Sequence, residues 1–417
     1  MSEQRTANSE QRTANSEQRT ANSSLSRAKS VKNDEFYTQY NDIEKEMNGY
    51  LEYNPNVFRN KTILLPCDDP EWSNFTKYFA QNFERFGLKK LISTSYAPNS
   101  KAFKSDYQPS LFESKNPQFD EDKTLSRGKI FTLDKDTFQD GRIDIHDLEW
   151  TYLEGDGDFR SDEIKKIRGE ADIVITNPPF SLFREFLAWL IEGDVKFSIL
   201  GNKNSITYKE VFPLIKNNKL WIGKTPLSVD IVFNSPEKIN PSDYPASSIK
   251  KIDGEFFLRS PSTWFSNIDH GRRHENLQLM TMQDNLRFNK KMKGKDKYDH
   301  YDNYDAIEVP FTNAIPSDFN GVMGVPISFL DKYNPDQFEI LGATQRGCHD
   351  DVPDFKKYDD YWEVRQNGER TGSTGGKTNE NTNISVNDGK KNYFINKDGH
   401  IIQSTYQRIF IRHKQAS

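Results

Sequence analysis

Four consecutive residues carry the clearest chemical signal in the chain, because Asn177-Pro178-Pro179-Phe180 come directly after the apolar run Asp172–Thr176. Two prolines remove two backbone donors and fix φ near about -65° twice, and a residue before proline is biased toward an extended conformation. The segment is therefore predicted to be a stiff loop. It offers two acceptors, the Asn177 side-chain oxygen and the Pro178 carbonyl, beside an aromatic ring.

This loop suits methyl transfer to an exocyclic amine on a heteroaromatic ring. The lone pair of such a nitrogen is delocalised, and two acceptors on its N–H bonds favour a tetrahedral, nucleophilic nitrogen. Phe180 can stack on the ring, worth about 1–3 kcal/mol per base. Most of the rate gain would then come from positioning and electrostatics. The alternative is a plain strand-to-helix turn, and the flanking strand and helix favour the chemical interpretation.

Strands and helices are predicted to alternate around this loop. Apolar runs predict strands at residues 61–66, 90–96, 171–176 and 197–200, and a further β-like stretch at 262–268. Helical spacing of apolar residues predicts helices over 71–79, 162–167 and 183–191, and a short helix from 42 to 47 that ends at Gly49. This alternation predicts a doubly wound, Rossmann-like α/β sheet with mostly parallel strands. Ligands bind at the carboxyl ends of such strands, where Asn177 lies.

Composition divides the chain into three parts. Residues 1–32 are a predicted disordered tail, in which residues 2–22 are three copies of Ser-Glu-Gln-Arg-Thr-Ala-Asn with only Ala as an apolar position. Residues 33–280 are the predicted catalytic domain, with a polar insertion at 97–148 that carries a short strand at 129–133. Residues 281–417 are predicted to be a less regular recognition region, with a mobile loop at 367–392.

The C-terminal part is basic although the whole chain has a net charge of -5. Six Lys or Arg residues lie within residues 287–297, and residues 365–417 hold nine basic residues against four acidic ones. The first cluster is either a solvated face or a set of phosphate contacts. The predicted DNA contacts are Arg287, Lys290, Lys291 and Lys293.

Several classes of protein are disfavoured by composition. No stretch approaches the ~20 apolar residues of a membrane span, and residues 1–5 have no apolar signal core. Two cysteines, Cys67 and Cys348, exclude a disulfide scaffold and fit a reducing cytoplasm. No metal site is predicted, because Gly271 disfavours a helix that would carry His270 and His274.

The Asn177–Phe180 motif after an apolar strand resembles the catalytic motif of S-adenosylmethionine-dependent amino-methyltransferases. Over residues 33–345 the chain is similar to the EcoRI-type adenine-specific DNA methyltransferases. The similar segments are Asn33–Gln39, Leu65–Phe75, Gly155–Asp162 and Gly201–Asn204.

This resemblance implies a role for each matching residue. Asn177, Pro178, Pro179 and Phe180 hold a flipped adenine. The implied cofactor contacts are Phe36, Tyr37 and Thr38 at the methionine part, Pro66, Asp68 and Asp69 in the turn after the first strand, and Asp158 with Phe159 at the adenine ring.

Two departures from the family pattern concern the cofactor. The turn at residues 66–70 has no glycine, and Ser93–Tyr96 contains no acid for the ribose hydroxyls. A sulfonium cofactor carries no pyrophosphate, so a glycine cradle is not required. Asp68 and Asp69 could alternatively cap the helix that follows them.

The sequence therefore predicts a site-specific DNA adenine-N6 methyltransferase that uses S-adenosylmethionine and flips its base out of duplex DNA. We expect a cytoplasmic monomer, and a cognate restriction endonuclease with which it need not form a complex. One alternative is methyl transfer to RNA or to a protein glutamine. Another is a non-catalytic DNA-binding protein that retains the fold.

Overall fold

The structure is a computed structural model, and the chain divides into two compact units. The first contains the residues up to Asn202 together with Asp230–Ile268, and the second contains Lys203–Val229 and Asp269–Ser417. The described residues are 37–71, 73–97, 117–134, 149–234, 240–243, 245–252, 254–344, 352, 356–374, 379, 381–389 and 392–414. The predicted tail and Phe36 lie outside them. The predicted boundary at residue 280 differs from the observed division, which also assigns residues 203–229 to the second unit.

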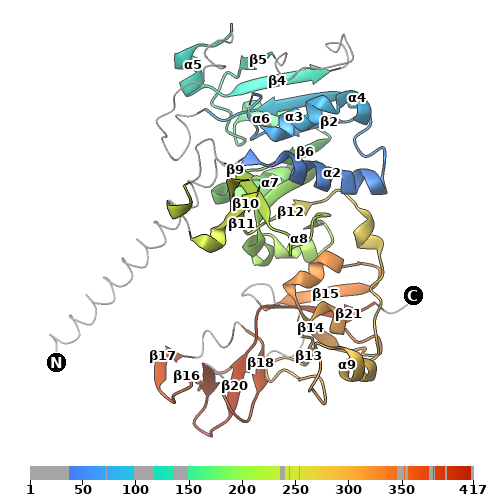
Figure 1. Ribbon diagram of the computed structural model, residues 1–417, viewed down its shortest axis with the longest axis vertical. Helices are drawn as coiled ribbons and strands as arrows, with labels where there is room; N and C mark the ends of the chain where they lie inside the picture. The colour runs from blue at the N-terminus through green and yellow to red at the C-terminus, as the bar shows by residue number, and fades with distance from the viewer. Residues whose placement is uncertain are drawn as a thin grey trace, which may run out of the picture. The chain divides into compact units, whose positions relative to one another are not determined.

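Seven strands of the first unit form one twisted sheet in the order β5-β4-β3-β2-β6-β7-β12 (Figure 1). Their bounds are β2 Thr62–Leu65, β3 Lys90–Thr94, β4 Lys129–Asp134, β5 Trp150–Tyr152, β6 Ile173–Thr176, β7 Lys196–Asn202 and β12 Ser262–Ser266. The four middle strands β3, β2, β6 and β7 are parallel, whereas β4, β5 and β12 are antiparallel to their neighbours. The α/β class is confirmed, but the sheet is mixed rather than mostly parallel.

Short helices connect these strands, and a second, smaller sheet belongs to the same unit. The helices are α2 Tyr40–Tyr53, α3 Asn74–Gln81, α4 Phe83–Phe86, α5 Glu121–Ser126, α6 Asp162–Arg168 and α7 Phe183–Glu192. The smaller antiparallel sheet has the order β1-β9-β11-β10, with β1 Tyr37–Thr38, β9 Ile231–Asn234, β10 Ile249–Ile252 and β11 Glu255–Ser260.

Two details of the predicted elements need correction. Helix α2 does not end at Gly49 but continues to Tyr53, because Met47 and Tyr50 are fully buried on its inner face. That packing outweighs the cost of about 1 kcal/mol for a glycine inside a helix. The strand predicted within the polar insertion is β4, and its residues 130–134 pair with β3, so this part of the insertion belongs to the sheet.

The second unit is rich in β-structure, which contradicts the prediction of an irregular C-terminal region. One sheet has the order β13-β14-β21-β15, and the other has the order β17-β16-β19-β20-β18. Their bounds are β13 Ala306–Glu308, β14 Val322–Pro326, β15 Phe338–Ala343, β16 Trp362–Val364, β17 Arg370–Thr374, β18 Asn383–Ser385, β19 Tyr393–Ile395, β20 Ile401–Ser404 and β21 Arg408–His413. The predicted mobile loop at 367–392 contains β17 and β18.

The remaining regular elements of the second unit are short. They include α8 Phe212–Lys216, the two-residue strand β8 Trp221–Ile222, α9 Met282–Phe288 and several 3₁₀ helices. No helix among the described residues of either unit is long and apolar enough to cross a membrane.

Candidate active site

The turn after β2 is held by polar side chains at the end of β3. The backbone N–H of Asp68 donates to the Thr94 carbonyl at 2.9 Å, and the Thr94 hydroxyl donates to the Pro66 carbonyl at 3.1 Å. The Ser93 hydroxyl donates to the Asp68 carbonyl at 2.5 Å. These bonds fix the turn without glycine, and they give the Ser-Thr end of β3 a structural role.

The Asp68 carboxylate points into the interior and joins two strand ends. The residue is only 5% exposed, and its oxygens accept from the hydroxyls of Ser73 and Thr176, each at 2.6 Å. Burial raises the pKa of Asp68 to about 7, although both hydroxyls oppose that shift. Thr176 is the last residue of β6, so this carboxylate holds the position immediately before Asn177.

The predicted motif emerges from β6 and leads into a helix. Pro178 is buried, whereas Asn177, Pro179 and Phe180 are half-buried. The Pro179 carbonyl accepts the N–H of Leu182 at 3.0 Å, which starts the 3₁₀ helix η5 Phe180–Leu182 ahead of α7. Asn177 and Phe180 therefore both lie just after the carboxyl end of a central parallel strand.

A neighbouring sheet packs against the aromatic ring of this motif. Phe180 contacts Phe233 of β9 edge-on, with ring centroids 6.3 Å apart. Phe233 is also the register partner of Thr38 in β1, and the Asn74 side chain donates to the Thr38 carbonyl at 2.8 Å. The family resemblance assigns Thr38 to the methionine part of the cofactor. Thr38 is thus bonded to Asn74 at the start of α3 and paired with β9, the strand beside Phe180. The side chain of Tyr37 is not among those described.

The loop after β5 lies flat against the segment that follows β3. Gly157 has φ of 84°, and a Cβ atom there would lie 2.1 Å from the Ser95 carbonyl oxygen. The N–H of Ala97 donates to the Asp156 carbonyl at 2.7 Å. Only glycine allows this approach, and it brings Asp158 beside Tyr96, whose hydroxyl donates to the carboxylate at 3.4 Å.

The two members of the predicted acid–aromatic pair occupy different environments. Asp158 is partly buried, which alone would raise its pKa, but hydrogen bonds from Arg160 outweigh burial and lower it. The shortest of these bonds is 2.6 Å. Phe159 is 4% exposed and packs edge-on against Phe186 and Trp189 of α7, at 5.0 and 5.8 Å. Asp158 therefore lies at the loop surface, whereas Phe159 anchors the loop in the core.

The N-cap of the helix that follows β2 is Ser73, not one of the two acidic residues of the turn. The Asp69 side chain accepts the N–H of Glu71 at 2.9 Å, and its carbonyl accepts the N–H of Ser73. Ser73 is the N-cap of α3, with its hydroxyl 3.0 Å from the N–H of Phe75. The capping alternative is therefore wrong for both acidic residues, because Asp69 forms a local turn and the Asp68 carboxylate accepts from Ser73 and Thr176.

The thiol of Cys67 lies at this end of the sheet, close to acidic groups, and it stays protonated. Burial, together with the charges of Asp68 and Asp158, raises the pKa of Cys67. A thiol in that state is not a nucleophile. The name strand-end site is used below for the turn at residues 66–69, the end of β3, the loop at residues 157–158 and the motif at residues 176–180.

The predicted DNA contacts lie in the second unit. Arg287 is the penultimate residue of α9, and Lys290, Lys291 and Lys293 follow it, all exposed. The Arg287 guanidinium lies 5.0 Å from the centroid of the Phe288 ring. These four residues are called the basic surface below.

The histidines considered as metal ligands have other contacts. Burial lowers the pKa of His270 to about 4, and its Nε2 lies 3.0 Å from the Ile222 carbonyl. His274 contacts Asp269 at 2.8 Å. Within the described residues, no group of three or more His, Cys, Asp or Glu could hold a metal ion.

Sequence reasoning missed the hydroxyl and glycine residues that build the strand-end site. They are Ser73, Ser93, Thr94, Gly157 and Thr176. Hydroxyls at the ends of the two buried strands that flank β2 were an available signal, because a buried carboxylate after β2 needs donors.

An α/β sheet with Asn-Pro-Pro-Phe at the end of a central parallel strand is consistent with the methyltransferase class. The chain belongs to the family described as adenine-specific methyltransferase EcoRI, whose model matches residues 24–414. This match confirms the predicted family and enzyme class.

Individual relatives agree with that assignment. The chain is 43% identical over 321 residues to the Type II methyltransferase M.EcoRI of Escherichia coli, covering 76% of this chain and 88% of that protein. It is 35% identical to M.MgeORF184P of Mycoplasma genitalium and 32% identical to M.MpnI of Mycoplasma pneumoniae, both named as Type II methyltransferases. Each of these matches covers 76% of this chain, with 85% and 84% of the relatives. No solved structure gave a significant match.

Proposed function

We propose that this chain is a site-specific methyltransferase that moves a methyl group from S-adenosylmethionine to the N6 amine of adenine in duplex DNA. One observation carries the proposal: the residue before Asn177 is locked to the turn after β2 by the Thr176–Asp68 hydrogen bond of 2.6 Å. The base-holding motif and the predicted cofactor turn are thereby fixed to each other. The adenine specificity of the family supports the choice of base, and the Type II relatives support DNA.

The acidic turns suit a cofactor that carries a positive sulfonium. Asp69 and Asp158 lie on separate loops at this end of the sheet, and the close approach of Gly157 to Ser95 holds the second loop near Tyr96. Thr38 with Phe36 and Tyr37 is proposed to contact the methionine part, Pro66 and Asp69 the middle, and Asp158 with Phe159 behind it the adenine ring. Bound S-adenosylmethionine supplies an electrophilic methyl group.

The residues of the motif hold and orient the adenine amine. The Asn177 side-chain oxygen and the Pro178 carbonyl accept its two N–H bonds, which localises the nitrogen lone pair. Phe180, braced by Phe233, stacks on the ring. Asn177 is neutral, so the proton stays on nitrogen until the new bond forms and then passes to solvent. Asp68, with both oxygens engaged inside the protein, positions Thr176 and the motif.

The adenine must leave the duplex to reach Asn177, at a cost of a few kcal/mol. We propose that Arg287, Lys290, Lys291 and Lys293 contact phosphates and stabilise the complex from the second unit. Binding should then weaken steeply with salt.

The deciding experiment is labelled methyl transfer from S-adenosylmethionine to unmethylated duplex DNA, followed by digestion to nucleosides. Label in N6-methyladenine is the expected result, and mapping the labelled positions gives the recognition sequence. Label only in RNA or in protein glutamine would reject DNA as the substrate. Folded protein that binds DNA and transfers no label would instead be a non-catalytic binder.

We also propose that the enzyme acts as a monomer and needs no complex with a cognate endonuclease. This proposal rests on the family resemblance. Light scattering on the DNA-bound and free protein tests it, and a dimer mass in either state would contradict it.

A further inference from the structure

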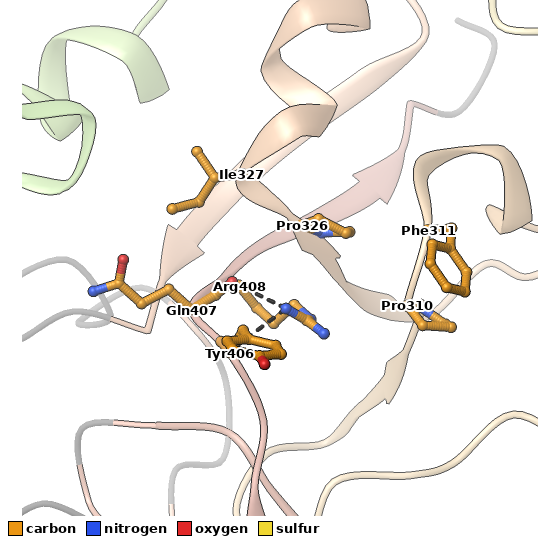
Figure 2. A pocket seen from close by; sticks show the side chains of 7 residues that line it. All are labelled: Pro310, Phe311, Pro326, Ile327, Tyr406, Gln407 and Arg408. Carbon is orange, nitrogen blue, oxygen red and sulfur yellow. Dashed lines mark hydrogen bonds between the residues drawn. The ribbon is translucent and has the colours of Figure 1, made fainter. Parts of the chain in front are cut away.

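An open apolar groove lies at one edge of the sheet formed by β13, β14, β21 and β15. It has a volume of about 690 Å³, and three chain segments line it. Figure 2 shows Pro310 and Phe311 after β13, Pro326 and Ile327 at the end of β14, and Tyr406 to Arg408 at the start of β21. Register places Pro326 opposite Arg408, so the groove is formed by the paired strand ends themselves.

Among the described residues that line the groove, the cation Arg408 is already neutralised. Arg408 is 7% exposed, and it binds both carboxylate oxygens of Glu308, at 2.5 and 3.0 Å. The Tyr301 hydroxyl donates to the same carboxylate. The remaining guanidinium nitrogen of Arg408, Nη1, donates to the carbonyls of Tyr406 and Gln407, as the dashed lines in Figure 2 show. These bonds hold the Arg408 side chain in place. Its positive charge is offset by Glu308 and is therefore not available to bind an anionic ligand.

Tyr406 is presented to solvent by a fixed backbone. Its carbonyl accepts from Arg408 and from the Thr405 hydroxyl, at 3.4 and 3.1 Å, while the residue as a whole is 82% exposed. An aromatic ring that is held at its backbone and left open to water at its faces loses little conformational entropy when a flat ligand stacks on it.

The basic surface adjoins this groove. The Lys291 ammonium lies 4.8 Å from the centroid of the Phe311 ring, which is 37% exposed. The side chain of Asn289 donates to the Asn313 carbonyl at 3.0 Å, which holds the end of α9 against the 311–314 segment. An exposed aromatic groove thus continues into a row of exposed cations. That combination is the one by which proteins bind unstacked nucleotides, with rings for bases and cations for phosphates.

We propose that this groove receives an unstacked nucleobase of the DNA substrate, which stacks on Tyr406 while Lys291 contacts the adjacent phosphate. The inference rests on the proposed function and extends it, because it assigns base contact to a surface outside the strand-end site. A phosphate inside the groove is disfavoured, since Glu308 neutralises Arg408. A purely apolar partner is disfavoured by the cations at the rim.

The test compares binding of two mixed-sequence duplexes, one fully paired and one with a single unpaired nucleotide, by fluorescence anisotropy. Wild-type protein should bind the second duplex more tightly. Tyr406→Ala should weaken that binding about tenfold and leave the salt dependence of log Kd unchanged, because no charge is lost. Tyr406→Phe should stay within about twofold of wild type.

Tyr53→Ala is the matched control, because Tyr53 is an exposed tyrosine of the first unit, at 45%. It should change neither affinity, and all three variants should keep the wild-type melting temperature. Equal losses in Tyr53→Ala and Tyr406→Ala, or no loss in Tyr406→Ala, would overturn the groove assignment.

Labelled methyl transfer, measured in parallel, distinguishes a failure of the groove assignment from a failure of the proposed function. If wild-type protein methylates DNA and Tyr406→Ala binds both duplexes like wild type, only the groove assignment fails. If wild-type protein neither binds nor methylates DNA, the proposed function fails and the groove assignment fails with it. Photo-crosslinking of a duplex containing 5-iodouracil at the unpaired position should place the crosslink on Tyr406.

Discussion

The strand-end site and the basic surface use polar residues in opposite ways. In the first, two hydroxyls donate to the buried Asp68 carboxylate and two more donate to backbone carbonyls of the same turn, and these hydrogen bonds of 2.6 Å and of 2.5 and 3.1 Å fix the loops. In the second, Arg287, Lys290, Lys291 and Lys293 are exposed. Buried polar groups act as a connected unit in which each partner matters, whereas exposed charges act through a screened, nearly additive field. Single substitutions should therefore have large effects at the first region and small, graded effects at the second.

The sharpest test of this contrast is Asn177→Ala. The change removes the acceptor that holds the amine, so methyl transfer should fall about 10³-fold, or about 4 kcal/mol, while DNA affinity stays within about twofold. Single-turnover transfer and anisotropy measure the two quantities separately. Asn56→Ala, the same replacement in an exposed turn, is the control and should behave as wild type. Transfer above about a tenth of the wild-type rate would show that Asn177 does not hold the amine.

A second prediction concerns the buried carboxylate of Asp68. Burial raises its pKa from 3.8 to about 7, so between these values the native state keeps a proton that the unfolded chain loses. Stability should therefore fall as pH rises from about 4 to about 7, by as much as about 4 kcal/mol. The Asp68→Asn variant has no titratable group at this position, so it should not show this fall in stability.

The measurement is urea unfolding of wild type and Asp68→Asn across that pH range. The free energy of unfolding of Asp68→Asn, relative to that of wild type, should increase as pH rises. Parallel curves for wild type and Asp68→Asn would mean that the carboxylate is not buried as described.

The third prediction uses two glycines with nearly the same backbone. Gly157 and Gly254 have φ of 84° and 89°, but a Cβ at Gly157 meets the Ser95 carbonyl, whereas nothing lies within 4 Å at Gly254. Gly254→Ala should cost about 1 kcal/mol for the left-handed backbone alone. Gly157→Ala should cost about 2–3 kcal/mol, since the loop must also move.

Denaturant unfolding gives both costs, and the KM for S-adenosylmethionine gives the functional consequence. Only Gly157→Ala should raise that KM, because only this loop carries Asp158. If both variants lose the same stability, the close approach of the two loops does not contribute.

The central elements were predictable because their signals are local. Apolar runs define β2, β3, β6 and β7, and two prolines mark the loop after β6. The bond between Thr176 and Asp68 spans 108 positions, so no local pattern indicates it. Asp68 itself was predicted as a cofactor contact, and only the tertiary structure shows both of its oxygens engaged inside the protein.

The two sheets of the second unit were not predictable for a different reason. Several of their strands have only three residues, including β16, β18 and β19, and polar turns separate them. Three residues are too few to establish an alternating pattern, so pairing with distant partners decides their conformation. The basic residues near α9 were visible in sequence, but their contact with the exposed rings of Phe288 and Phe311 was not.

The smallest expected effect separates two lysines of the same basic run. Lys290 is exposed and forms no ion pair with any described residue, whereas Lys295 is paired with Asp299. If the run contacts DNA phosphates, Lys290→Gln should lower the slope of log Kd against log salt concentration by about 1. Lys295→Gln should lower it less, because Asp299 already offsets that charge. Titrations of one duplex at several salt concentrations measure both slopes. Equal slopes for Lys290→Gln and wild type would show that this segment is a solvated face that does not contact DNA. The contrast between the two regions would then be supported only at the strand-end site.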